Sequence, residues 1–92
     1  MDQPRHRIPD HAVRRYAERS LGIITAATTE AGHIRELELR GVDVPAIRRR
    51  LQELATFGAA FGAPIVIADG VKVVIMKDHV PTVLCRKSSD QL

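Results

Sequence analysis

A histidine and two arginines recur at intervals of four residues near the start of the chain. His11, Arg15 and Arg19 occupy positions i, i+4 and i+8, so a helix would carry their side chains along one face. An imidazole can move a proton near neutral pH, while guanidinium groups bind a phosphodiester and stabilise the charge that develops on it. This pattern indicates phosphate chemistry on an exposed helix face.

The same face has a simpler interpretation. Cationic side chains on one side of a helix are also typical of a solvated surface, here with Asp10 and Glu18 as ion-pair partners. His11 would then contact only the start of the helix. Spacing alone leaves both interpretations open.

Further cationic side chains are candidates for binding nucleic acid. Arginine outnumbers lysine by eleven to three, and ten of the arginines lie within residues 1–50. Because arginine can donate two parallel hydrogen bonds to phosphate, this bias favours a polyanionic partner. The codon usage of a GC-rich genome produces the same excess. The candidates are Arg14, Arg48, Arg49, Lys72, Lys77 and Arg86.

Metal and cofactor sites are not expected. His6, His11, His33 and His79 have no spacing typical of a metal site, and the chain contains no glycine-rich loop that would hold a phosphate group. Cys85 is the only cysteine, so no internal disulfide can form. It lies in an apolar segment, where we expect a buried structural thiol.

Length and composition predict one soluble domain. The 92 residues, 45% of them hydrophobic, suit a single domain over residues 1–92, with flexible ends at 1–7 and 87–92. No apolar run approaches the roughly 20 residues that a membrane helix needs, and the first residues lack the apolar segment of a signal peptide. A cytoplasmic location without membrane contact is the expectation.

Three helices are predicted in the first two-thirds of the chain. Apolar residues at helical spacing, capping residues before them and glycines after them indicate helices over 11–21, 30–40 and 43–62. Asp10 and Asp43 are the expected N-caps of the first and third helices, Thr28 or Thr29 is expected to cap the second, and Leu21 is expected to face the core. The small residues of 57–63 are expected to pack closely against a backbone.

Three strands are predicted in the remainder. Beta-branched runs indicate strands over 65–68, 71–77 and 82–86. Asp69-Gly70 is a favoured dipeptide of a type I′ turn, in which both central residues have positive φ. The expected fold is α+β, with N-terminal helices packed on a C-terminal three-stranded antiparallel β-meander.

Both ends of the chain resemble a known group of proteins. The sequence Ile8-Pro9-Asp10-His11-Ala12, followed by Arg15 and Arg19, is similar to the opening of small bacterial domains related to RelE and ParE toxins. The segments 71–75 and 80–84 are similar to their last two strands, where a Thr or Ser stands among apolar residues. The resemblance covers about residues 8–21 and 65–86.

The resemblance implies a RelE-like fold and a ribonuclease that needs no metal. The 2′-hydroxyl of RNA would attack the adjacent phosphorus, with His11 as base or acid, Arg15 and Arg19 as phosphate clamps, and Thr82 as an orienting hydroxyl. It also implies RNA or the ribosome as substrate and an antitoxin as a possible protein partner.

A second class of function stays open. A non-catalytic accessory protein of a phage or mobile element could use the same arginine-rich helix faces to bind a protein or a nucleic acid. With only three aromatic residues, the chain does not resemble a binder that stacks bases on a sheet. The sequence does not indicate an oligomeric state.

Overall fold

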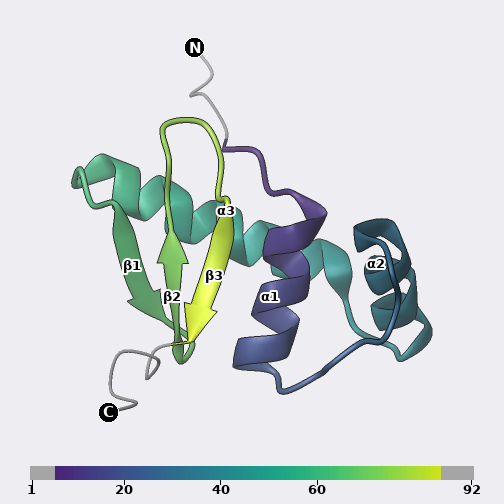
Figure 1. Ribbon diagram of the computed structural model, residues 1–92. Coiled ribbons are helices and arrows are strands. Elements are labelled where there is room, and N and C mark those ends of the chain that lie inside the picture. The colour runs from purple at the N-terminus through teal and green to yellow at the C-terminus, as the bar shows by residue number, and fades with distance from the viewer. Residues whose placement is uncertain (1–5, 86–92) are drawn as a thin grey trace.

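The chain forms three helices and then a three-stranded antiparallel sheet (Figure 1). The computed structural model describes residues 6–85. The elements are α1 (Asp10–Ser20), α2 (Glu30–Leu39), α3 (Val44–Ala60), β1 (Ile65–Ala68), β2 (Val71–Val74) and β3 (Thr82–Cys85). The predicted α+β class, with helices before strands, is therefore confirmed.

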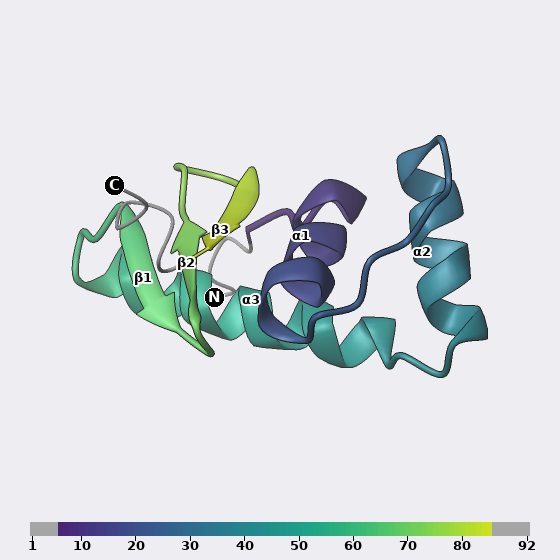
Figure 2. The same cartoon turned by 60° about the horizontal axis from the view of Figure 1, so that its bottom comes forward.

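The longest helix, α3, forms a layer of its own. It runs behind the sheet in Figure 1 and passes beneath both the sheet and α1 in Figure 2. Helix α1 packs closely beside β3, and α2 lies on the other side of α1. The two layers share one apolar core, whose largest fully buried side chains are Leu37, Leu51, Val13, Val71, Val73, Val80 and Val83.

Polar caps begin two of the helices as predicted. Thr29 Oγ1 accepts a hydrogen bond from the Gly32 N–H at 3.0 Å, and Asp43 Oδ1 accepts one from the Ala46 N–H at 3.0 Å. Each bond satisfies a backbone donor that the first turn of a helix leaves free. These contacts are local in sequence, which is why the sequence alone predicted them.

Both ends of α1 differ from the prediction. Pro9 is the N-cap residue and Asp10 is the first helical residue, because the Asp10 carboxylate is bound by Arg48 of α3 instead of capping the helix. At the other end, Leu21 is 49% exposed and does not face the core. The helix ends at Ser20, and Gly22, with φ of 73°, turns the chain away.

The strands meet in the predicted order. Asp69 and Gly70 have φ of 54° and 78°, which confirms the turn with two positive φ values between β1 and β2. Strand β2 ends at Val74, three residues before its predicted end. The chain closes a loop there, since the Met76 N–H donates to the His79 carbonyl at 2.9 Å. The last predicted residue of β3, Arg86, lies outside the described residues.

One face of the sheet is covered by α3 and the other is open. Val66, Val73 and Val83 share a cross-strand row and are buried on the α3 side. We call the opposite side the open face. It consists of two cross-strand rows, Ile65–Val74–Thr82 and Ile67–Lys72–Leu84. The first row ends beside α1, and this is where the candidate site lies.

Helix α3 comes very close to the sheet at Gly58. A Cβ atom there would lie 2.5 Å from Ile75 Cδ1 and 2.7 Å from Val66 Cγ2. The expected close packing is present, but against the side chains of Val66 in β1 and of Ile75 directly after β2, and not primarily against a backbone.

Arg7 joins the start of the chain to the loop after β2. Its N–H donates to the Asp78 carbonyl at 2.8 Å, and its carbonyl accepts from the Val80 N–H at 3.0 Å. These bonds form an isolated parallel bridge between Arg7 and His79, so α1 and the sheet are linked at this end as well.

Candidate active site

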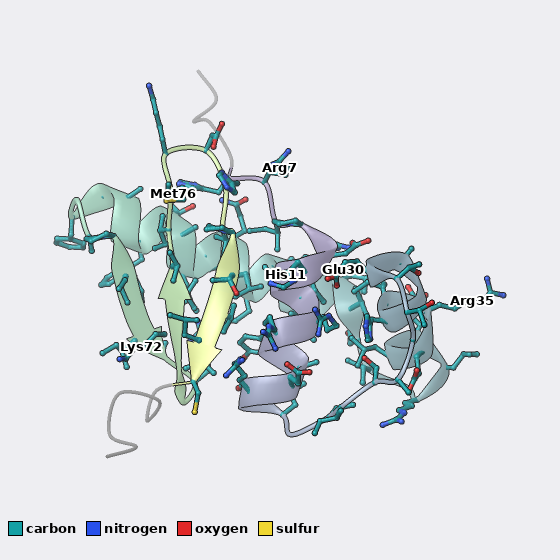
Figure 3. The ribbon with its side chains drawn as sticks, in the orientation of Figure 1. Arg7, His11, Glu30, Arg35, Lys72 and Met76 are labelled. Carbon is teal, nitrogen blue, oxygen red and sulfur yellow. The ribbon has the colours of Figure 1, made fainter. Side chains whose placement is uncertain are left out.

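His11 lies where three elements meet. Its Nε2 atom is 3.4 Å from Thr82 Oγ1, and its Nδ1 atom is 3.1 Å from Glu30 Oε2. His11 belongs to the first turn of α1, Thr82 begins β3 and Glu30 begins α2. Figure 3 shows Glu30 reaching from α2 towards the end of α1 that carries His11. A hydroxyl, an imidazole and a carboxylate thus stand in series.

The carboxylate of this series is held by an arginine. Arg14 binds Glu30 with two hydrogen bonds, Nε to Oε1 at 2.8 Å and a terminal nitrogen to Oε2 at 3.0 Å. The bidentate geometry fixes the plane of the carboxylate. The hydrogen bonds from Arg14, assisted by His11, lower the pKa of Glu30 to about 2. Glu30 is therefore an anion at neutral pH.

An anionic Glu30 determines how the imidazole can act. Nδ1 has two neighbours, Glu30 Oε2 at 3.1 Å, which can only accept a hydrogen bond, and a terminal nitrogen of Arg14 at 3.3 Å, which can only donate one. The shorter contact, with Glu30, favours the tautomer of His11 that carries its proton on Nδ1. The lone pair of Nε2 is then directed towards Thr82. The distance of 3.4 Å is that of a weak hydrogen bond, and Nε2 can accept a proton from a substrate group placed nearby. The side chain of His11 is 37% exposed, so such a group can reach it.

Arg15 and Arg19 extend the site along α1, as their spacing predicts. Arg15 donates to Glu18 at 2.7 Å, and this ion pair leaves other guanidinium donors of Arg15 unused. Among residues 6–85, no acidic side chain forms an ion pair with Arg19. The Nε atoms of both arginines are buried without a hydrogen-bond partner in the described structure. Because these Nε atoms are covered by protein, a phosphate oxygen could meet only the other, more exposed parts of the two guanidinium groups.

The residues predicted to bind nucleic acid have different surroundings. Arg14 is bound to Glu30 and Arg48 to Asp10, so both hold the fold together. Arg49 is exposed on α3, and Lys77 is exposed in the loop after β2. Lys72 projects from the sheet at a distance from His11, as Figure 3 shows. Arg86 lies outside the described residues.

Sequence reasoning missed Glu30. It also assigned Arg14 to nucleic acid, although this side chain is only 17% exposed. No spacing rule connects residues 11 and 30, because they lie on different helices whose packing brings them together. A signal that could have drawn attention to Glu30 is its place directly after the cap Thr29, where an acid is favoured by the helix dipole.

A second polar cluster ties the turn between β1 and β2 to α1 and α3. Asp69, in the turn between β1 and β2, accepts a hydrogen bond from the Tyr16 hydroxyl at 2.7 Å and from Arg50 Nε at 2.8 Å. Ser20 Oγ donates to the Asp69 carbonyl at 2.8 Å. The bonds to its carboxylate lower the pKa of Asp69, mainly through Arg50. The cluster holds the β1–β2 hairpin, and with it the sheet that includes β3, against α1 and α3.

The described residues give no sign of a metal centre or a membrane helix. Within residues 6–85, no three side chains of His, Cys, Asp or Glu gather where they could hold a metal ion. Across the same residues, every helix is too short or too polar to cross a bilayer. The chain matches no protein-family model, no curated protein and no solved structure in the comparisons made with them.

Proposed function

We propose that this protein is a metal-independent endoribonuclease related to the RelE and ParE toxins. The observation that carries the proposal is the position of His11 between the anionic Glu30 and the hydroxyl of Thr82. Arg15 and Arg19 follow His11 on the same helix at intervals of four residues. This set can transfer a proton and bind a phosphodiester.

In the proposed reaction, the 2′-hydroxyl of RNA attacks the adjacent phosphorus. His11 Nε2 takes the proton of that hydroxyl as the O–P bond forms, and Glu30 stabilises the imidazolium that results. Arg15 and Arg19 bind the non-bridging oxygens and stabilise their added charge. The bond to the 5′-oxygen breaks and that oxygen takes a proton from water, while the His11 imidazolium gives its proton to the hydroxide that remains. The products are a 2′,3′-cyclic phosphate and a 5′-hydroxyl.

Thr82 has an orienting role in this scheme. Its hydroxyl contacts Nε2 in the absence of substrate and can turn to donate to a phosphate oxygen when substrate binds. A Thr82→Val variant, which keeps the shape and removes the hydroxyl, is therefore expected to cleave more slowly but still to cleave.

The test is cleavage of RNA by the purified protein, alone and with ribosomes present. We expect cyclic phosphate ends, no effect of EDTA, and a loss of about 10²–10⁴-fold in rate for His11→Ala. Circular dichroism will show whether the variant is folded. Arg35→Ala is the control for a lost cation, since Arg35 is exposed on α2 and points away from His11 (Figure 3).

Three results would overturn the proposal. Wild-type protein that cleaves no RNA under either condition would favour a non-catalytic binding protein. A folded His11→Ala variant that retains full activity would remove His11 from the reaction. Cleavage of a substrate with a 2′-deoxyribose at the scissile position would show that RNA's own hydroxyl is not the nucleophile, and would point to Thr82 instead.

A further inference from the structure

Thr82, His11 and Glu30 are connected in the manner of a catalytic triad, and we call these three residues the triad. In a catalytic triad a carboxylate binds one nitrogen of an imidazole, and the other nitrogen faces a hydroxyl that acts as a nucleophile. Here Glu30 Oε2 lies 3.1 Å from His11 Nδ1, and His11 Nε2 lies 3.4 Å from Thr82 Oγ1. Figure 3 shows His11 between β3 and Glu30. The longer contact suits a free enzyme, since catalytic hydrogen bonds often tighten only when substrate binds.

The carboxylate of the triad is able to orient the imidazole. Arg14 holds the Glu30 carboxylate with hydrogen bonds of 2.8 and 3.0 Å, and the pKa of Glu30 is lowered to about 2, so an anion faces Nδ1 at neutral pH. Because Arg14 shares that negative charge, the main role left to Glu30 is to fix the plane and the tautomer of the imidazole. The acid of a triad provides orientation of this kind.

The hydroxyl of Thr82 is not used to hold the fold together. Within residues 6–85, the contact with His11 is the only hydrogen bond formed by Thr82 Oγ1. Thr82 lies opposite Val74 in the sheet, and both belong to the open face, which α3 does not cover. Thr82 and His11 are each half-buried. A small electrophile can therefore approach the hydroxyl from the open face.

We propose that Thr82 is a nucleophile and that the triad hydrolyses small carboxylic esters. This activity goes beyond the cleavage of RNA, in which Thr82 only orients the substrate, and it does not depend on whether RNA is cleaved. A hydroxyl is a weak nucleophile by itself and needs an adjacent base that takes its proton as it attacks. His11 Nε2 is that base.

The reaction has two halves. Thr82 Oγ1 attacks the carbonyl carbon of the ester while His11 Nε2 takes the hydroxyl proton. The bond from that carbon to the alcohol oxygen breaks, and the alcohol leaves with the proton from Nε2, so the acyl group remains on Thr82. Water then attacks the acyl carbon and gives a proton to Nε2, the bond to Oγ1 breaks, and Oγ1 takes that proton. Ester and water become acid and alcohol, and the triad returns to its first state.

The surroundings of Thr82 indicate the kind of ester. Val74 lies opposite Thr82 on the open face and Ile65 lies beyond it, so an aliphatic surface meets the acyl group. One turn along α1 from His11, Arg15 keeps guanidinium donors that its ion pair with Glu18 does not use. Such donors bind a negative charge on the substrate or on the tetrahedral intermediate. We expect an ester of a short aliphatic acid with a negatively charged alcohol.

Hydrolysis of two acetate esters tests the proposal, in a Cys85→Ser parent that lacks the one thiol of the chain. The probes are para-nitrophenyl acetate and a ring-sulfonated, negatively charged analogue of it. We expect the parent to hydrolyse the charged ester faster, Thr82→Ser to stay active, and Thr82→Val to lose about 10²-fold or more in rate. Thr56→Val, at an exposed position of α3, is the matched control and should equal the parent. A parent without activity, or a folded Thr82→Val variant as fast as the parent, would overturn the proposal.

Covalent labelling identifies the nucleophile. An alkyl fluorophosphonate reacts with an activated hydroxyl and releases fluoride, so mass spectrometry should find a phosphonyl group on Thr82 of the parent and none in Thr82→Val or His11→Ala. No label, or a label only on another residue, would overturn the proposal.

Cleavage of RNA by the same preparations separates this proposal from the ribonuclease. Thr82→Val should still cleave RNA, because its hydroxyl only orients that substrate. Ester hydrolysis without RNA cleavage would reject the ribonuclease alone. RNA cleavage without ester hydrolysis would reject the nucleophilic role of Thr82 alone.

Discussion

His11 and Thr82 stand 71 positions apart in the sequence, yet His11 Nε2 lies 3.4 Å from Thr82 Oγ1. The contact exists because α1 packs along β3 and because the Asp69 cluster holds the hairpin against α1. The imidazole thereby gains a hydroxyl beside Nε2, while Glu30 and the guanidinium of Arg14 lie beside Nδ1. The chemistry of His11 therefore depends on all three of these neighbours.

Glu30 is expected to act by positioning His11. Glu30→Gln removes the charge but keeps the shape, so the rate of RNA cleavage should fall by about 10²-fold, the lower end of what general acid–base catalysis contributes. The fall should appear in kcat with little change in KM, since Glu30 does not bind RNA. Glu38→Gln, on the exposed side of the same helix, should be as active as wild type. Equal kcat values for the two variants would contradict this role.

The ion pair of Glu30 should make stability depend on pH in the acid range. The pKa of Glu30 is lowered to about 2 in the folded protein, from the value of 4.5 that is ordinary for a glutamate and expected in the unfolded chain. As pH falls from about 4.5 to about 2, the unfolded chain takes up the proton first, and stability is lost. The side chain is 42% exposed, so the loss should stay below about 1 kcal/mol. The melting temperature of Glu30→Gln should fall less over this pH range than that of wild type. Identical pH profiles for the two proteins would show that Glu30 does not cause the loss of stability.

Binding of RNA should depend steeply on salt if Arg15 and Arg19 contact phosphates. Each contact releases counterions, so the slope of log affinity against log salt should fall by about 0.7 per arginine replaced by alanine. The measurement is binding of a single-stranded RNA at several salt concentrations. Arg35→Ala should leave the slope unchanged. A flat response in wild type would indicate that phosphates are not the ligand.

The turn between β1 and β2 should tolerate substitution only by residues that accept positive φ. Gly70 has φ of 78°, and no atom lies within 4 Å of the position that a Cβ would take, so any cost arises in the backbone. Gly70→Val should lower the free energy of unfolding by more than about 1 kcal/mol, and Gly70→Asn by clearly less. Urea denaturation compares them, and equal stability of the two variants would argue against the type I′ turn.

Gly58 should be required for the close approach of α3 to the sheet. Gly58→Ala places a methyl group against Ile75 Cδ1, which lies 2.5 Å from the Cβ position, and should cost about 1–3 kcal/mol through overpacking. Ile75→Val removes that atom, so the double variant should be less destabilised than the sum of the two single variants. Strict additivity would show that the contact is not the cause.

The sequence by itself determined the local features of this fold. The caps Thr29 and Asp43 and the turn Asp69-Gly70 were predictable, because each depends on residues within a few positions of one another. The order of helices and strands followed from hydrophobic periodicity. The shared face of His11, Arg15 and Arg19 also required only the geometry of a helix.

Tertiary structure decided which of these side chains meet. Arg14, predicted to bind nucleic acid, instead forms an ion pair with Glu30. Asp10, predicted to cap α1, instead forms an ion pair with Arg48. Such pairs join different elements, and the energy that places them comes from packing an apolar core whose residues lie elsewhere in the chain. Local sequence patterns do not encode a contact between α1 and α2, so the link from Glu30 to His11 could be found only once both helices were packed together.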